Sequence, residues 1–364
     1  MRSASLVILV TLASPLIAPA ALAQNTDQAK VVCQTNADLT SCDEMIAKAD
    51  PRDERELAIS YATRAGMRAD IGDFSGAVSD IEKARSFVPP NPALEAIIQV
   101  LTSLAHAPKG LAVACSIESA APRQRVDACS QLIDSTSGTP DVKFYYYAAR
   151  ATAYFDLGDI AKARADIGTS LAARPDNADF VAEDISFDYG AGDYQTALAK
   201  AEEALRQLRR PPVALALLPG QLAYLMGYHS MAIQRMTAAI HADPYDLGPS
   251  YWISLLRQED HEDVTHNFQR MIDSFGDRAF PSKIALLLLG KLSPQMLVEA
   301  AQSLPLPIRQ QRLCTAYFTI GHQAWLANDK PAAMTAFQNA LQTDQSRMIE
   351  YQASKVLLQK ISVN

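Results

Sequence analysis

The alternation of apolar and polar positions predicts a chain built from amphipathic helices. Apolar residues recur three and four positions apart in runs of roughly a dozen residues, separated by Gly, Asp and Pro. Residues 154–177, YFDLGDIAKARADIGTSLAARPDN, show the arrangement: a Gly-Asp pair, an amphipathic run rich in small residues, then a Pro. This order indicates a turn, a helix and the end of that helix.

The Gly-Asp pair marks the register of an internal repeat. Its occurrences, some of them altered, lie at residues 72–73, 158–159, 192–193, 227–228 and 328–329. The three central marks are 34 and 35 residues apart. Between the last two marks there is room for two degenerate units, near Asp260 and Ser293.

Small residues recur at fixed places relative to each mark. The fifth residue after the mark is always Ala: Ala77, Ala163, Ala197, Ala232 and Ala333. The preceding helix carries its own small residue, at Ala65, Ala151, Gly220 and Gly321. Small side chains let two helices cross closely. Gly tolerates a left-handed turn, and Asp can cap the second helix.

These features together resemble tetratricopeptide repeats, which have a 34-residue period. The resemblance implies an all-α fold: an α-solenoid, a right-handed superhelix of antiparallel helix pairs that stack to bury one elongated core. The step from Gly72 to Gly158 is not a multiple of 34, so we expect extra helix or an interruption in residues 93–123.

The first residues, MRSASLVILVTLASPLIAPAALAQ, are typical of a secretory signal peptide. Arg2 precedes an apolar run at 6–13, and small residues end the segment, so we expect cleavage between Ala23 and Gln24. The apolar run is too short to span a membrane. The prediction is a soluble periplasmic protein without stable membrane insertion; an uncleaved anchor is the alternative.

Charge argues against nucleic acid as a partner. The 364-residue sequence has a formal net charge of −7, and removal of a signal with one base and no acid leaves −8. An acidic chain without a basic stripe disfavours nucleic-acid binding.

Five cysteines suggest two disulfides and one free thiol. Cys33 and Cys42 lie nine residues apart, Cys115 and Cys129 fourteen apart, and Cys314 remains. In an exported protein, near pairs of this kind indicate disulfides. Zinc is the weaker alternative, because no Cys-x-x-Cys occurs.

Each cysteine pair precedes an apolar helix, a Tyr-x-x-Arg sequence and a Gly-Asp mark, with the arginines at Arg64 and Arg150. We interpret this as duplication of a cysteine-stapled unit; a coincidental pattern is the alternative. The predicted parts are a signal peptide at 1–23, a first stapled unit at 24–105, central repeats with the second stapled unit at 106–246, and C-terminal repeats at 247–364.

The last part resembles a more specific family. FPSKIALLLLGKLSPQMLVEAA (280–301), CTAYFTIGHQAWLANDKPAAMTAFQNALQTD (314–344) and IEYQASKVLL (349–358) resemble, in this order, the C-terminal part of NlpI-type envelope proteins. That family consists of outer-membrane lipoproteins that act as adaptors for cell-wall hydrolases and periplasmic proteases. This chain departs from it at Gln24, where the family has a lipidated Cys.

One position of the first helix carries aromatic side chains in four units: Phe155, Tyr189, Tyr224 and Trp325, with Ala69 in the earliest. In tetratricopeptide proteins this position belongs to a stripe that faces the concave groove. We expect these aromatic residues, with Asp156, Gln221 and His322, to bind a peptide or helix. Packing of the rings inside the solenoid is the alternative.

Catalytic and metal-binding signals are weak. HEDVTH (261–266) places its histidines five apart, which separates them around a helix, so we interpret it as a solvated helix. Cys314 has no obvious base and is expected to be a core residue. We predict no cofactor, no metal and no catalytic residue, and a scaffold that binds envelope proteins or peptides. A cell-wall enzyme with an unrecognised site and a structural homodimerisation module are the alternatives.

Overall fold

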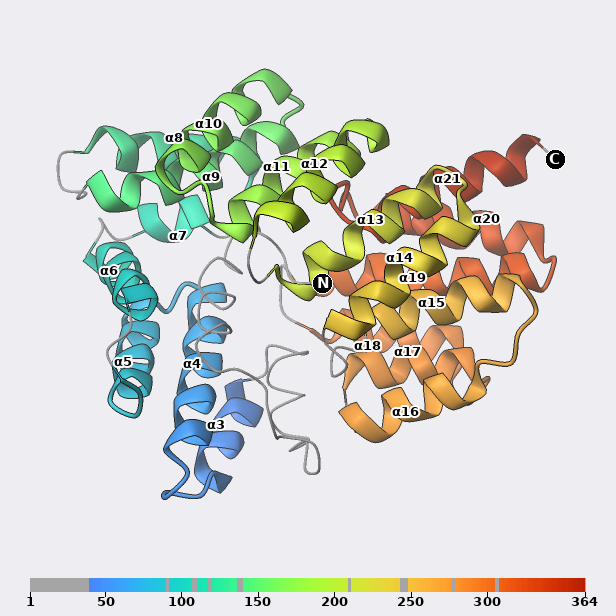
Figure 1. The fold of residues 1–364 in the computed structure, drawn as a ribbon, viewed down its shortest axis with the longest axis horizontal. Helices are drawn as coiled ribbons and strands as arrows, with labels where there is room; N and C mark the ends of the chain where they lie inside the picture. The colour runs from blue at the N-terminus through green and yellow to red at the C-terminus, as the bar shows by residue number, and fades with distance from the viewer. Residues whose placement is uncertain are drawn as a thin grey trace. The chain divides into compact units, whose positions relative to one another are not determined.

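The computed structural model confirms the all-α prediction (Figure 1). It describes residues 39–89, 92–106, 110–116, 120–135, 140–208, 211–242, 248–276, 279–304 and 308–363. Within these ranges the chain forms nineteen helices and no strand. The predicted signal peptide, its cleavage site at Gln24 and Cys33 lie outside the described residues.

The chain divides into two compact units, residues 2–184 and residues 185–364, which we call the N-terminal and C-terminal units. The division falls inside one helix, α11 (Ala178–Gly190), and coincides with neither of the predicted boundaries at 105/106 and 246/247.

The N-terminal unit contains the helices α3 (Leu39–Lys48), α4 (Glu54–Asp70), α5 (Phe74–Arg85), α6 (Pro92–His106), α7 (Leu111–Ser116), α8 (Pro122–Asp134), α9 (Pro140–Asp156) and α10 (Ile160–Ala173). Helices α6 and α7 account for the extra helix expected in residues 93–123. The C-terminal unit continues with α12 (Tyr194–Gln207), α13 (Val213–Leu225), α14 (His229–Ala242), α15 (Gly248–Glu259), α16 (Thr265–Phe275), α17 (Phe280–Leu288), α18 (Pro294–Gln302), α19 (Ile308–Leu326), α20 (Lys330–Leu341) and α21 (Ile349–Val363).

The Gly-Asp marks sit in tight turns between paired helices, as predicted. Each turn contains one residue with positive φ: Gly72, Gly158, Gly192, Gly227, His261, Gly290 or Asn328. In four turns the next Asp caps the second helix, accepting a backbone N–H three residues later; Asp159, for example, accepts from Lys162 N at 3.2 Å. Glycine removes the steric cost of the left-handed turn and the cap satisfies an orphan donor. The degenerate units near Asp260 and Ser293 are present as the pairs α15–α16 and α17–α18.

The small residues lie where the paired helices cross. All five predicted alanines, from Ala77 to Ala333, are completely buried. A Cβ atom on Gly220 would lie 2.5 Å from Met236 Cγ, and one on Gly321 would lie 2.6 Å from the Phe337 ring. Only glycine therefore fits these two crossings without a shift of the partner side chain.

The N-terminal unit repeats one polar clamp. Arg64 donates two hydrogen bonds to Asp80, from Nε at 2.8 Å and Nη2 at 2.6 Å, and a third to Asp43. Arg150 bonds Asp166 in the same way at 2.7 and 2.9 Å and donates its third bond to Ser130. The tyrosine three residues before each arginine lies under the guanidinium. Equivalent residues making equivalent contacts support the duplication.

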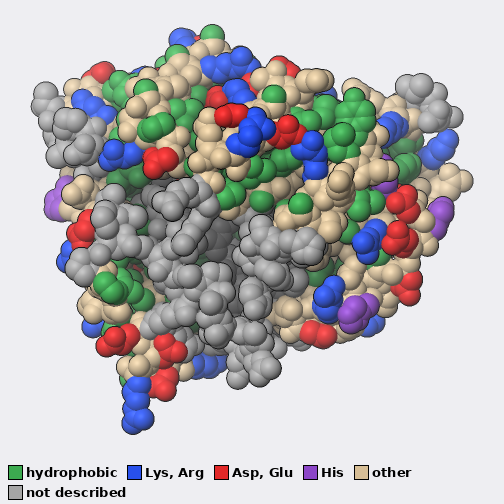
Figure 2. Space-filling model, viewed as in Figure 1, with side chains coloured by type: hydrophobic (Ala, Val, Ile, Leu, Met, Phe, Trp, Pro, Cys, Tyr) green, Lys and Arg blue, Asp and Glu red, His purple; other side chains and the backbone are tan. Residues whose placement is uncertain are grey.

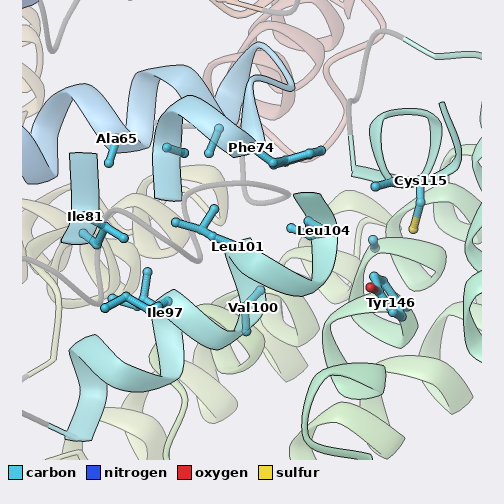
Figure 3. Packing of buried hydrophobic residues seen from close by; sticks show 14 of the residues in the cluster. Ala65, Phe74, Ile81, Ile97, Val100, Leu101, Leu104, Cys115 and Tyr146 are labelled. Atoms are coloured by element: carbon cyan, nitrogen blue, oxygen red, sulfur yellow. The ribbon is translucent and has the colours of Figure 1, made fainter. Parts of the chain in front are cut away.

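A disulfide joins Cys115 of α7 to Cys129 of α8, as predicted. It lies in an apolar core that α4 to α9 share; Figure 3 shows Phe74, Ile97, Leu101 and Tyr146 in this core with Cys115. Cys42 is fully buried, and its predicted pairing with Cys33 stays a prediction.

Candidate partner-binding surface

The structure buries most of the predicted groove residues. Phe155, Gln221, Tyr189, Tyr224 and His322 are buried, Trp325 is half-buried, and Asp156 is exposed. Burial of these rings is what the packing alternative expects, and partner binding by the predicted residues stays a prediction. The accessible surface of the predicted stripe is reduced to Trp325 and Asp156.

Asp156 is the counterion of a buried arginine. Its Oδ2 accepts a hydrogen bond from Nη1 of Arg125 at 3.1 Å. Arg125, on α8, is completely buried and also donates to the Ala149 carbonyl at 3.3 Å and to Thr152 Oγ1 at 2.5 Å. A buried guanidinium requires such partners, which gives Asp156 a structural role in holding α8 to α9.

Tyr189 is covered by the C-terminal segment of the chain. Its hydroxyl donates to the backbone carbonyl of Arg347 at 2.5 Å, just before α21. At the start of the next helix, α12, the Tyr194 hydroxyl donates to Gln352 Oε1 of α21 at 2.9 Å. Helix α21 also contacts α13, whose residues from Leu217 to Leu225 are all buried. The predicted binding side of these helices is therefore occupied by the chain itself.

Two of the predicted residues meet at a carboxylate that the repeat pattern did not indicate. Glu259, the last residue of α15, accepts hydrogen bonds at its Oε1 from the Tyr224 hydroxyl and from Nε2 of His322, both at 2.9 Å. Tyr224 comes from α13 and His322 from α19, so this one carboxylate ties together the first helices of three pairs.

A second histidine extends the cluster to the surface. Nδ1 of His229, at the start of α14, lies 3.6 Å from Glu259 Oε2, and its Nε2 lies 3.0 Å from Asp260 Oδ2. Side-chain exposure rises outward, from 14 % for Glu259 through 30 % for His229 to 47 % for Asp260. We call the residues Tyr228, His229, Glu259, Asp260 and Trp325 the Glu259 edge.

Aromatic packing supports this edge from inside. The Trp252 ring lies 5.9 Å from Tyr224 and 5.3 Å from Phe318, and His322 contacts Trp325 edge-on at 5.7 Å. Burial, and then the negative charge of Glu259, raises the pKa of Tyr224 well above its usual value. The phenol therefore stays protonated and keeps donating to Glu259.

Sequence reasoning missed Glu259, His229 and Asp260. Glu259 and Asp260 lie in a degenerate unit, where His261 replaces the turn glycine and no Gly-Asp mark fixes the register, and His229 follows the altered mark at 227–228. One signal could have pointed to these residues: a run of polar residues ends α15, at the place where the repeat puts a turn.

The segment HEDVTH is not one helix, which corrects that prediction. His261 is a turn residue with φ 61°, whereas His266 lies in the first turn of α16; both are exposed. Across the described ranges no three His, Cys, Asp or Glu side chains are placed to hold a metal ion. Cys314 is buried, and burial followed by the nearby Glu350 charge raises its pKa well above the usual thiol value.

Two further observations concern the surface. None of the described helices combines the length and apolarity needed to cross a bilayer. On the face shown in Figure 2, basic and acidic side chains are interspersed over the described surface.

No protein-family model matches the chain, and no curated protein matches it. Similar solved structures include the APC/C hetero-tetramer Cut9–Hcn1, at 12 % identity and a TM-score of 0.41 over 92 % of this chain. This chain spans 62 % of that one. Two bacterial tetratricopeptide repeat proteins follow. The C-terminal part of a Cytophaga hutchinsonii protein has 13 % identity, a TM-score of 0.36 and coverage of 77 % of this chain and 94 % of its own. A Parabacteroides merdae protein has 14 % identity, a TM-score of 0.35 and coverage of 85 % and 100 %. Likeness at this level tells nothing about partners.

Proposed function

We propose that the chain is an exported, non-catalytic scaffold that binds envelope proteins or peptides in the periplasm. The signal-like first residues support export, and the C-terminal resemblance to NlpI-type adaptors supports an envelope role. Cell-wall hydrolases and proteases are the partner classes that this resemblance suggests.

The Glu259 edge carries the proposal. Helix ends from three pairs converge there, around a carboxylate held rigidly by Tyr224 and His322. At its rim Tyr228 is 54 % exposed, and Met231, one turn further along α14, is exposed as well. Exposed aromatic and thioether groups beside acidic side chains combine apolar contact area with charge selectivity, as protein-binding surfaces do. We therefore place partner contacts at this edge.

The state of Cys314 supports a non-catalytic role. A buried thiol with a raised pKa remains protonated, and a protonated thiol is a poor nucleophile. The His229 and His322 side chains are engaged with carboxylates that join helices, a structural use of groups that could otherwise act in acid–base chemistry.

The test is crosslinking of the mature protein in its native periplasm, followed by mass spectrometry of captured proteins. The variant Tyr228→Ser/Asp260→Asn removes an exposed ring and an exposed charge from the edge. Its matched control is Leu157→Ser, which removes an exposed apolar side chain from the N-terminal unit. We expect the edge variant to lose captured proteins that the control retains, with both proteins folded by circular dichroism.

Three outcomes would count against the proposal. Equal capture by the edge variant and the control would move binding away from the Glu259 edge. Only self-crosslinks would favour a homodimerisation module. Turnover of cell-wall fragments by the purified protein, lost in a folded variant, would favour an enzyme.

A further inference from the structure

Helix α21 returns to the beginning of the C-terminal unit. Hydrogen bonds link its surroundings to α11 and α12 across 158 residues of sequence, from Tyr189 to Arg347 and from Tyr194 to Gln352. It contacts α13, α19 and α20. Helices α11, α13 and α19 are the first helices of their pairs, and the first helices supply the predicted partner-facing stripe.

The side chains of α21 show what this face accepts. Ile349, Ala353, Leu357 and Ile361 follow one another at intervals of four residues, and all four are buried. A four-residue spacing places them along one stripe of a helix. Because α21 packs on α20, α19 and α13, the site that it occupies fits a helix that presents small and aliphatic residues at this spacing.

One residue of α21 fits this environment poorly. Glu350 is buried, and its Oε2 accepts no hydrogen bond from any described residue. Burying a carboxylate oxygen without a hydrogen-bond partner opposes docking, because that oxygen loses its water and no donor replaces it. A helix with an uncharged side chain at this place would bind the same face more tightly.

We propose that α21 can be displaced from the C-terminal unit by an amphipathic helix of a partner protein. That helix has small and aliphatic residues every four positions and an uncharged residue where α21 has Glu350. The proposal rests on the proposed scaffold function and gives it a second binding mode, with α21 as the built-in competitor. The present occupant is an α-helix, so the partner that we propose is a helix and not an extended peptide.

Docking of α21 is expected to depend on pH. Burial raises the pKa of Glu350, while a hydrogen bond from its own backbone and then the charge of Arg312 on α19 act in the opposite direction. Cys314 of α19 and Tyr251 of α15 also sense the Glu350 charge, but both have raised pKa values and stay neutral. Because the docked pKa of Glu350 lies above its value in a released helix, docking is strongest below the released pKa and weakens as pH rises through the docked one.

The experiment uses the full mature chain and two readouts. Hydrogen-exchange protection is measured for α21 and for its neighbours α19 and α20 at pH 5.5 and 7.5. In parallel, fluorescent synthetic peptides of residues 346–363 are titrated into the protein: the natural sequence, a Glu350→Gln version and a scrambled control.

We expect α21 to exchange by local opening, with lower protection than α19 and α20, and with protection that falls at the higher pH. Glu350→Gln in the chain should raise that protection and remove its pH dependence. The Glu350→Gln peptide should bind about tenfold more tightly than the natural one, the size expected when a buried unpaired group is removed. The scrambled peptide should not bind.

The proposal is overturned if α21 exchanges hydrogen only together with α19 and α20, if Glu350→Gln leaves that exchange unchanged and if no peptide binds. In that case α21 is a fixed structural helix. A concentration-dependent dimer that dissociates when peptide is added would replace the partner helix by α21 of a second copy, which also overturns it. Neither readout uses a natural partner, so failure here is distinguishable from failure of the crosslinking test.

Discussion

At the scale of single residues, the glycines at the helix crossings make the sharpest prediction. Gly321→Ala places a Cβ atom against the Phe337 ring, and the rigid ring has little freedom to move. We expect a loss of about 1–3 kcal/mol, the usual cost of overpacking a core. Urea unfolding of the variant against the natural protein measures it.

Gly168→Ala is the matched control. Gly168 also lies in a helix, α10, but a Cβ there meets nothing within 4 Å. Alanine should stabilise by about 0.4–1 kcal/mol, because it restricts the unfolded chain and favours helix. If Gly321→Ala proved as harmless as Gly168→Ala, the small-residue crossing would not determine how closely α19 and α20 pack.

The hydrogen bonds at Glu259 make a second prediction. Tyr224→Phe keeps the ring but removes one donor to the carboxylate, and we expect a cost of about 1 kcal/mol. Glu259→Gln weakens both charge-assisted bonds and should cost about 1–3 kcal/mol. Thermal unfolding monitored by circular dichroism compares them.

Glu262→Gln is the control for this pair, since Glu262 lies in the same turn but is exposed and only 3.7 Å from Arg257. It should change stability by no more than about 0.5 kcal/mol. A Glu259→Gln effect of the same size would reduce the carboxylate to an ordinary surface charge.

Whether a single residue's role could be predicted depends on how far along the sequence its contact partners lie. The alanines and glycines at the crossings were predictable, because their size is dictated by one neighbouring helix at a fixed sequence distance. Glu259 was not, since its partners Tyr224 and His322 lie 35 and 63 residues away in opposite directions. The burial of Tyr189 depends on the still more distant Arg347.

At the scale of elements, the duplicated arginine clamp joins helices in both halves of the N-terminal unit. Arg150→Gln would leave Asp166, whose side chain is only 10 % exposed, without its cation. We expect a loss of about 3–5 kcal/mol, as for other broken buried ion pairs. Arg64→Gln should cost less, although Asp80 is at least as buried, because Nη1 of Arg68 lies 3.0 Å from Asp80 Oδ2 and keeps that carboxylate paired. Chemical denaturation of both variants is the measurement.

Two further variants separate charge from geometry in this clamp. Arg150→Lys keeps the charge but cannot make the paired hydrogen bonds, so it should recover part of the loss and no more. Replacement of both partners, Arg150→Leu with Asp166→Leu, should recover more, because no buried charge remains unpaired. Full recovery by lysine would mean that the two-bond geometry contributes nothing.

The helix pairs themselves were predictable, whereas the position of α21 was not. Pairing depends on a turn and a cap, and the two residues of the Gly-Asp mark supply both. The return of α21 to α11 and α13 depends on the rotation accumulated over five helix pairs, and no short stretch of sequence encodes that sum. Its burial changes which surfaces a partner can reach.

At the scale of the whole molecule, the two units differ in what holds them together. The N-terminal unit contains a disulfide, buried arginine pairs and repeated clamps. In the C-terminal unit the first helices α13 and α15 are largely buried, and α21 packs against α13. We infer that oxidation matters to the first unit and helix exchange to the second.

Export therefore makes the last prediction. The protein recovered from the periplasm should begin at Gln24, carry −8 formal charge, and contain Cys115 and Cys129 as a disulfide. The same chain without residues 1–23 should remain in the reducing cytoplasm with both thiols free.

Closing the loop between Cys115 and Cys129 contributes up to about 3 kcal/mol in the chain-entropy description. The cytoplasmic form should therefore lose stability in the N-terminal unit, while exchange in α19 and α20 stays the same. Intact mass after alkylation and hydrogen exchange measure both properties. A periplasmic protein that retains Met1 would refute cleavage after Ala23, and one that alkylates at Cys129 would refute the disulfide.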